Sequence, residues 1–198
     1  MLDLGIMNFE KFSLPEKIAG DRLILLRRRH EHDEELFKLI DSSREFLRRF
    51  LFWVDDTKTV DDVKTVTDIF SRNWDEQNSF EYVFLDKQTG KMVGAGGIHT
   101  ISYMNRMAEY GYYLDQKAVG NGYASEFVRL MEKELFSRKI HRLVIECDED
   151  NKASAKVAER NGFVYEGRLR DAKFAYGGFR NELVYAKINS YLFFQLEW

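Results

Sequence analysis

The segment KAVGNGYASE (117–126) joins a glycine-rich bend to the start of a helix. Gly120 and Gly122 flank Asn121, and the residues that follow are apolar at helical spacing. Glycine has no Cβ atom, so the backbone can bend sharply here and come close to a ligand. The first N–H groups of a helix have no partner within it, and the helix dipole adds partial positive charge at that end. The segment therefore predicts an anion site, best suited to a phosphate or a pyrophosphate.

This segment differs from two common phosphate-binding loops. No Lys-Ser/Thr pair follows the glycines, as it would in a P-loop. Ser125 stands where the third glycine of a dinucleotide-binding loop would be. An ordinary tight turn between a strand and a helix would use the same residues, so the segment alone leaves both interpretations open.

Length and composition indicate one globular domain. We expect residues 1–198 to form it, with residues 1–20 as an N-terminal arm and a core from about 21 to 188. Apolar residues make up 44% of the chain, and a net charge of −3 with interspersed signs suggests neither disorder nor nucleic-acid binding. We find no secretory signal or membrane-length apolar run and expect a cytoplasmic protein. A single cysteine, Cys147, excludes an intramolecular disulfide, and we expect no metal.

Hydrophobic periodicity predicts the elements of a mixed α/β fold. The predicted strands are 22–28, two within 80–101 that flank a turn at 88–90, 107–114, 141–147, about 164–170 and about 181–188. The predicted helices are two within 33–54 with a break near Ser42–Ser43, then 59–74, about 122–138 and 150–163. These segments predict a mostly antiparallel sheet of about seven strands flanked by helices.

Four stretches of the chain together resemble one family of enzymes. They are FLFWVDDTKTVDD (50–62), GIHTISYMNRMAEYGYYL (97–114), GNGYASEFV (120–128) and DNKASAKVAERNGFVYEGRLRDA (150–172). In this order they resemble the GNAT superfamily of N-acetyltransferases, and within it the RimJ/RimL-type branch of ribosomal-protein N-terminal acetyltransferases. The resemblance runs from roughly residue 20 to residue 188. The first position of the family's cofactor loop is Lys117 here instead of Arg or Gln.

The resemblance implies that acetyl-CoA binds in an opening between two splayed strands, 107–114 and 141–147. The residues it assigns to the pantetheine arm are Tyr112, Tyr113, Leu114 and Asn151. The residues it assigns to the pyrophosphate are Gly120, Asn121, Gly122, Tyr123 and Ala124. For the loop at 117–126, the anion would then be the pyrophosphate of coenzyme A. Asn151 would equally serve as a plain N-cap of the helix that follows it.

Transfer of an acetyl group needs an unprotonated amine, a group that removes its proton and a group that protonates the leaving thiolate. The resemblance assigns the last role to Ser154. Our first candidate for the base is Glu109, which sits mid-strand among tyrosines that would exclude water. A solvent-facing or arginine-paired glutamate would look the same in the sequence. Gly111 lies in the same strand and indicates a bulge or a close backbone approach.

Two features of the sequence bear on the catalytic base. The ribosomal-protein branch has a glutamate soon after the Asn-Gly-Phe segment, and that position is Lys173 here, with Asp171 as a nearby substitute. The four histidines, which form no visible cluster in the sequence, give no sign of a Ser-His-Asp site. They are His30, His32, His99 and His141.

For the acceptor, the resemblance places Trp53 in the pocket. Arg49 belongs either to the solvated basic face of a helix or to a basic rim that would steer an acidic peptide terminus. The function we expect is transfer of an acetyl group from acetyl-CoA to a protein N-terminal α-amine. The alternatives are a small acceptor, such as a polyamine, an amino acid or an antibiotic amine, and a non-catalytic acyl-CoA-binding module. The arginines at 44, 48 and 49 argue mildly against a polyamine. The apolar stretch SYLFFQLEW (190–198) would pack on the core or join a homodimer interface.

Overall fold

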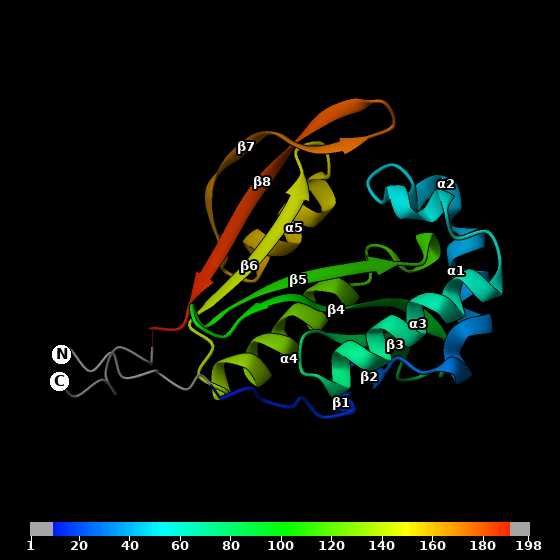
Figure 1. Cartoon of the computed structure of the whole chain (residues 1–198), viewed down its shortest axis with the longest axis horizontal. Coiled ribbons are helices and arrows are strands. Elements are labelled where there is room, and N and C mark those ends of the chain that lie inside the picture. Colours follow the sequence, from blue (N-terminus) through cyan, green and yellow to red (C-terminus); the bar gives the residue numbers. More distant parts are fainter. Residues whose placement is uncertain (1–9, 191–198) are drawn as a thin grey trace, which may run out of the picture.

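The computed structural model describes residues 10–190 and shows one continuous sheet of eight strands (Figure 1). The spatial order is β1-β2-β3-β4-β5-β6-β8-β7, and all neighbouring pairs are antiparallel except β5 and β6. The strands are β1 Lys17–Ala19, β2 Leu23–Arg27, β3 Phe80–Asp86, β4 Met92–Ser102, β5 Met107–Leu114, β6 Arg142–Asp148, β7 Val164–Ala175 and β8 Gly178–Ile188. The mixed α/β class and the mostly antiparallel sheet are confirmed.

The sheet has one strand more than the seven predicted. β1 lies in the expected N-terminal arm, where Ile18 pairs opposite Leu25 and both side chains are buried. A three-residue strand is too short to show a period of two, which is why the pattern missed it. The apolar C-terminal stretch falls mainly on residues 191–198, which lie outside the described part of the chain.

The last hairpin is also longer than predicted. β7 continues to Ala175 and β8 begins at Gly178, whereas the sequence suggested ends near 170 and 181. Pairing is interrupted between Leu169 and Lys173 and then resumes, so the two strands form one long ribbon with an irregular middle.

Five α-helices and three short 3-10 helices lie among residues 10–190. They are α1 Asp33–Ser42, α2 Arg44–Leu47, α3 Val60–Asp75, α4 Tyr123–Ser137 and α5 Lys152–Arg160, with 3-10 turns at His30–His32, Phe52–Asp55 and Gln116–Ala118. The predicted break near Ser43 is confirmed, and its hydroxyl group donates to Asp115 and accepts from the N–H of Gln116 beyond β5. In this part of the chain, no helix combines the length and apolar character needed to cross a membrane.

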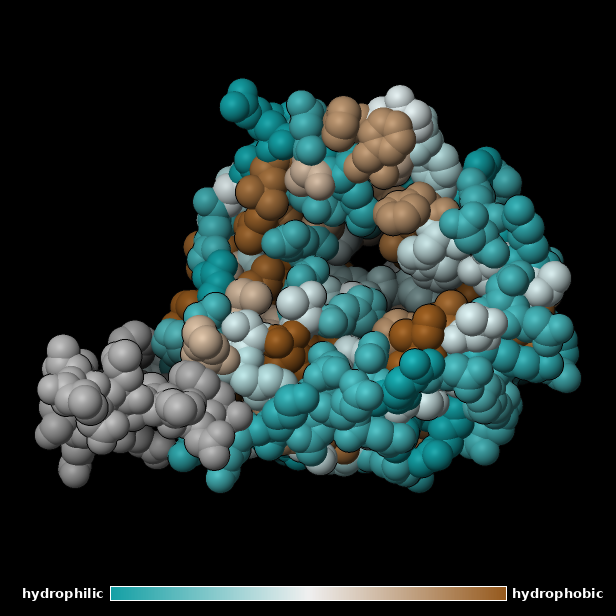
Figure 2. All heavy atoms as spheres, in the orientation of Figure 1, coloured by the Kyte–Doolittle hydropathy of each residue, from teal (hydrophilic) through white to brown (hydrophobic). Residues whose placement is uncertain are grey.

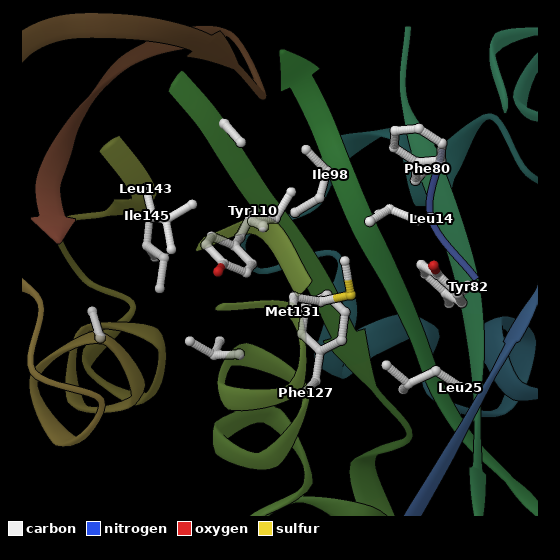
Figure 3. Close-up of a cluster of buried hydrophobic side chains, with 14 of the residues drawn as sticks. Leu14, Leu25, Phe80, Tyr82, Ile98, Tyr110, Phe127, Met131, Leu143 and Ile145 are labelled. Carbon is white, nitrogen blue, oxygen red and sulfur yellow. The ribbon is translucent and has the colours of Figure 1, made fainter. Parts of the chain in front are cut away.

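Helices cover both faces of the sheet. On one face Phe127 and Met131 of α4 pack against the aromatic side chains of β3 and β5, including Tyr110 (Figure 3). The ring centroids of Phe84 and Phe127 lie 4.6 Å apart. On the other face Leu36 and Ile40 of α1 pack against alternate residues of β3 and β4. Burial of these apolar faces is the main stabilising contribution to the fold.

The two parallel strands of the sheet separate along their length. β5 and β6 pair from Met107 opposite Arg142 to Tyr110 opposite Ile145, and beyond that point they have no pairing with each other. Each strand continues on its outer side, β5 with β4 as far as Leu114 and β6 with β8 as far as Asp148. The result is a V-shaped opening that begins after Tyr110, visible in Figure 1 as the divergence of β5 and β6. The predicted splayed strand pair is confirmed.

Candidate functional site

The opening between β5 and β6 contains a cavity of about 640 Å³. Residues from both faces of the sheet line it, among them Trp53, Glu109, Tyr112, Glu146 and Ser154. Figure 2 shows the hollow near the centre of the face, between the β7–β8 hairpin and α2. The cavity therefore connects the helix α5 side of the sheet with the helix α1 side through the split.

Carboxylates line the α1 side of the split. The strand registers place Glu81 of β3, Glu109 of β5 and Glu146 of β6 on the same face. No other described residue makes a hydrogen bond or an ion pair with the carboxylate of Glu109 or Glu146. Burial raises the pKa of Glu146, and the nearby charges of Glu109 and Glu182 add to the shift. Such a surface favours a positively charged group in the cavity.

A histidine on the same face is paired with one of these carboxylates. Nε2 of His99 lies 2.9 Å from Oε2 of Glu81, and the His99 ring stacks on Phe70 of α3. Glu81 is 3% exposed, whereas the His99 side chain is open to the cavity. Burial lowers the pKa of His99, but the charge and hydrogen bond of Glu81, with the charge of Glu109, outweigh it and raise the pKa above its ordinary value.

The α5 side of the split carries two hydroxyl groups in contact. Oγ of Ser154 and the phenol oxygen of Tyr112 lie 3.0 Å apart, and burial raises the pKa of Tyr112. Cys147 is the free thiol beside them, and burial raises its pKa to about 11, so it is uncharged at neutral pH. The side-chain oxygen of Asn151 accepts a hydrogen bond from the N–H of Ser154. Asn151 is therefore the N-cap of α5, one of the two roles considered from the sequence. Its cap bond fixes the helix turn that presents Ser154.

The glycine loop lies at the end of β5 and forms an outer pocket of about 620 Å³ with Arg22 and Lys87. Gly120 and Gly122 have φ values of +88° and +80°, which glycine adopts more readily than other residues. The N–H groups of residues 120–124 have no acceptor in the part of the chain that the structure describes. Free amides at a helix N-terminus beside Arg22 and Lys87 suit a phosphate group, and the carboxylates of Asp21 and Asp86 line the same pocket.

The residues that the sequence analysis assigned to the pyrophosphate therefore lie at one pocket. Four of them line it, namely Gly120, Asn121, Gly122 and Tyr123. Ala124 is buried in the first turn of α4. The phenol of Tyr123 donates to Asp86, and Arg22 donates to the carbonyl oxygen of Asn121. Both contacts join the loop to the ends of β2 and β3.

The acceptor side differs from the sequence expectation in its charges. Trp53 lines the cavity with its ring against Tyr113, 5.3 Å away. Arg49 is exposed, lies over the ring of Phe50 and is not among the described residues that line the cavity. Arg44 and Arg48 make ion pairs with Asp41 and Asp55. Their charges are therefore directed to neighbours outside the cavity.

Lys173 lines the cavity, and its ammonium group lies 3.4 Å from Glu182 of β8. Asp171 belongs to the irregular stretch of β7, where its φ is +51° and its N–H donates to Asn181. It is not among the described lining residues, whereas Glu182 is. The carboxylate that reaches the cavity from the hairpin therefore comes from β8.

The sequence did not predict several titratable residues that line the cavity, among them Glu81, His99, Glu146 and Glu182. A charged residue inside a buried strand, as in FEYVFL (80–85) or LVIEC (143–147), is the signal that could have found the first and third. No group of three or more His, Cys, Asp or Glu residues within 10–190 is arranged to hold a metal ion.

Comparisons with known proteins agree with this geometry. Residues 22–164 match the family described as acetyltransferase (GNAT) domain. The ribosomal-protein-serine acetyltransferase of Escherichia coli (strain K12) is 30% identical over 79% of this chain and 87% of its own length. The putative ribosomal N-acetyltransferase YdaF of Bacillus subtilis (strain 168) is 28% identical over 83% of this chain and 87% of its own.

A solved structure shows the same architecture with a ligand. RimL, a ribosomal L7/L12 α-N-protein acetyltransferase in complex with coenzyme A, superposes with a TM-score of 0.83 and 26% identity. The match covers 87% of this chain and 98% of that one. The chain described here belongs to the GNAT family of N-acetyltransferases, in its RimJ/RimL-type branch.

Proposed function

We infer that this protein transfers an acetyl group from acetyl-CoA to the N-terminal α-amine of a protein. The observation that carries the proposal is the cavity through the β5–β6 split, which has a hydroxyl pair on one side of the sheet and an acidic face on the other. The glycine loop forms a separate pocket. The relatives named as ribosomal-protein acetyltransferases support the acceptor class. A cytoplasmic location is part of the proposal.

The residues present suit the cofactor. The free amides of residues 120–124, with Arg22 and Lys87, would hold the pyrophosphate. The unpaired stretch of β5 at Tyr112, Tyr113 and Leu114 would offer backbone groups to the pantetheine arm, and Asn151 faces the same cavity. Acetyl-CoA supplies the acetyl thioester, whose carbonyl carbon the amine attacks directly. The chain's own residues bind it, orient the amine and move protons.

The acidic face would hold the acceptor as an ammonium ion. Glu109 and Glu146 flank the split and make no hydrogen bond or ion pair with another described residue, although the charge of Lys173 acts on Glu146. An amine would therefore find two carboxylates that could accept its hydrogen bonds. We assign to Glu109 the role of holding the amine at the split and assisting loss of its proton. Trp53 would form the apolar wall of the acceptor pocket.

On the other side of the split, Ser154 would give its hydroxyl proton to the leaving sulfur. It would recover a proton from the reacting nitrogen through the hydroxyl of Tyr112. The proton balance closes because the ammonium ion loses two protons in forming the amide, one to the sulfur and one to a base.

The acid-lined cavity also favours a second acceptor class. The arginines that argued against a polyamine do not line the cavity: Arg44 and Arg48 pair with aspartates and Arg49 lies over Phe50. Glu109 and Glu146 line it without an ion pair, whereas Lys173 pairs with Glu182 and Arg28 donates to Thr67 and Val63. A small di- or polycationic amine therefore remains the second candidate. A non-catalytic acyl-CoA-binding module has only Lys173 in its favour.

Two measurements test this function. Calorimetric titration with acetyl-CoA, and separately with ATP, should show binding of acetyl-CoA alone. A panel of peptides with free or blocked N-termini, run beside polyamines, should then show release of free thiol only with the free N-termini. Thiol release with polyamines alone would replace the acceptor, and absence of acetyl-CoA binding would overturn the proposed function.

A further inference from the structure

His99 is the extra residue of a bulge in β4. Ile98 pairs with Tyr110 and Thr100 pairs with Glu109, so His99 has no partner across the ladder. Bulges redirect a side chain, and this one turns the imidazole toward β5. A Cβ atom placed on Gly111 would lie 2.2 Å from Cε1 and 2.3 Å from Nδ1 of His99. Gly111 is thus glycine because the ring occupies the space of its side chain, which confirms the predicted close approach.

A second glycine makes room for the partner of His99. A Cβ atom on Gly97 would lie 2.6 Å from Oε2 of Glu81, the atom that pairs with Nε2 of His99. It would also lie 1.9 Å from the carbonyl oxygen of Phe80. Two positions in adjacent strands therefore lack side chains where this histidine–carboxylate pair sits. The pair is built into the sheet and does not arise from flexible surface residues.

The carboxylate fixes which ring nitrogen is free. A buried carboxylate only accepts hydrogen bonds, so Nε2 of the neutral His99 ring carries the hydrogen and donates it to Glu81. The lone pair is then on Nδ1, at the ring edge that lies over Gly111. Gly111 is the first residue of β5 beyond its last pair with β6. The free nitrogen is therefore at the start of the split.

The charged groups around the ring come from three directions. Glu81 of β3 lies behind it and Glu109 of β5 beside it, and both favour the protonated ring. Arg28 also lies near the Phe70 ring, and its guanidinium group donates to the Thr67 hydroxyl and to the carbonyl oxygen of Val63. The two carboxylates therefore stabilise an imidazolium ion once it forms.

We propose that His99, oriented by Glu81, is the base that takes the proton from the acceptor amine. The assignment rests on the proposed acetyl transfer. An N–H bond of the ammonium ion breaks, its electron pair stays on nitrogen, and the proton moves to Nδ1. The amine is then free to attack the thioester carbonyl carbon. The imidazolium ion, which faces the open cavity, releases its proton to water, and Glu109 keeps the ammonium ion beside the ring.

Steady-state kinetics test the proposal, with a peptide from the panel whose free N-terminus the wild type acetylates. His99→Gln should lower kcat at least tenfold, since a positioned base contributes about 10²–10⁴ in rate. It should also remove the rising limb of the kcat–pH profile, because the ring must be neutral to act. Glu81→Gln removes the charge that raises the pKa of His99. The rising limb of the kcat–pH profile of this variant should therefore move to lower pH. An unchanged kcat and pH profile in His99→Gln would overturn the proposal.

His30 offers a matched control. His30 pairs with the carboxylates of Asp33 and Asp68, and these raise its pKa as Glu81 raises that of His99. His30 is not among the described residues that line the cavity. His30→Gln should leave kcat and the pH profile unchanged. Thermal melting and acetyl-CoA affinity check that every variant is folded. If Glu81→Gln does not fold, Gly111→Ala is the second variant: its new Cβ atom displaces the His99 ring, so kcat should fall as in His99→Gln.

A second readout needs neither acceptor nor cofactor. Nitrogen-15 NMR of the labelled histidine rings should show neutral His99 protonated on Nε2, with a midpoint above that of a free imidazole. Glu81→Gln should lower that midpoint. A neutral ring protonated on Nδ1 would overturn the proposal, because no lone pair would face the split. If the wild type transfers nothing, the proposed function fails while the NMR result still stands, and the two failures are thereby distinguished.

Discussion

The hydroxyl oxygens of Tyr112 and Ser154 lie 3.0 Å apart, one on β5 and the other on α5, across the mouth of the split. Neither strand pairing nor helix packing requires this contact. It places a donor beside the free thiol of Cys147, on the side of the sheet opposite the carboxylates. The two sides of the split therefore carry complementary groups, with acids where the proposed amine would enter and hydroxyls where a thiolate would leave.

Replacement of Ser154 by alanine should lower kcat by a factor of about 10–100, because a proton donor for the leaving group is lost. The dissociation constant of acetyl-CoA should change less than threefold, since the backbone N–H of residue 154 still donates to the N-cap residue Asn151. Kinetics and calorimetry on the same preparation measure both. Equal losses in kcat and affinity would instead make Ser154 a binding residue. Tyr112→Phe is the companion variant and should show a smaller loss in kcat.

Gly122→Val should weaken acetyl-CoA binding at least tenfold. The residue has φ +80°, and its new Cβ atom would lie 3.0 Å from a terminal guanidinium nitrogen of Arg22. A β-branched residue therefore has to leave the left-handed region and shift the loop amides. Calorimetric titration with acetyl-CoA measures the effect.

Gly177→Val is the control for backbone strain alone. Gly177 lies in the β7–β8 turn with a similar φ of +76°, and a Cβ atom added to it would have no other atom within 4 Å. The substitution should cost comparable stability while leaving acetyl-CoA affinity within about twofold. Equal weakening by both valines would show that the loop amides are not the binding site.

Glu126→Ala should destabilise the protein by about 3 kcal/mol. The buried carboxylate accepts the backbone N–H groups of Arg22 at 2.8 Å and Leu23 at 3.1 Å, and alanine leaves both donors unpaired. The same contacts tie the first turn of α4 to β2, so acetyl-CoA affinity should fall as well. Urea unfolding measures the free energy. Glu134→Ala, which removes only the partly exposed pair with Arg138 on the same helix, should cost less than about 1 kcal/mol.

Local patterns predicted much of the fold and one half of the site. The helical spacing after Gly122, the capping of α5 by Asn151 and the alternation in β5 are all properties of neighbouring residues, and the structure shows each of them. The two short helices before Val54 were also visible as a periodic pattern with a break at Ser43. Strand β1 was missed because three residues carry no period.

The other half of the site depends on register. Glu81 and His99 are 18 positions apart and meet only because β3 and β4 pair and β4 bulges at one residue. No spacing rule in the sequence gives that bulge. The glycines at 97 and 111 were visible, but what fills the space beside each one becomes clear only when the strands are side by side.

Glu146→Gln should raise KM for the amine acceptor about three- to tenfold with little change in kcat, because a carboxylate that attracts the ammonium ion becomes neutral. Glu149→Gln is the control, since Glu149 pairs with Arg168 and is not among the described residues lining the cavity. Because the pKa of Glu146 is raised, the direction in which KM changes with pH is also a test. As pH falls, Glu146 loses its charge earlier than an ordinary glutamate, so KM of the wild type should rise in mildly acidic buffer. KM of Glu146→Gln should lack this rise, and parallel pH profiles of the two proteins would rule out a role for Glu146 in holding the acceptor.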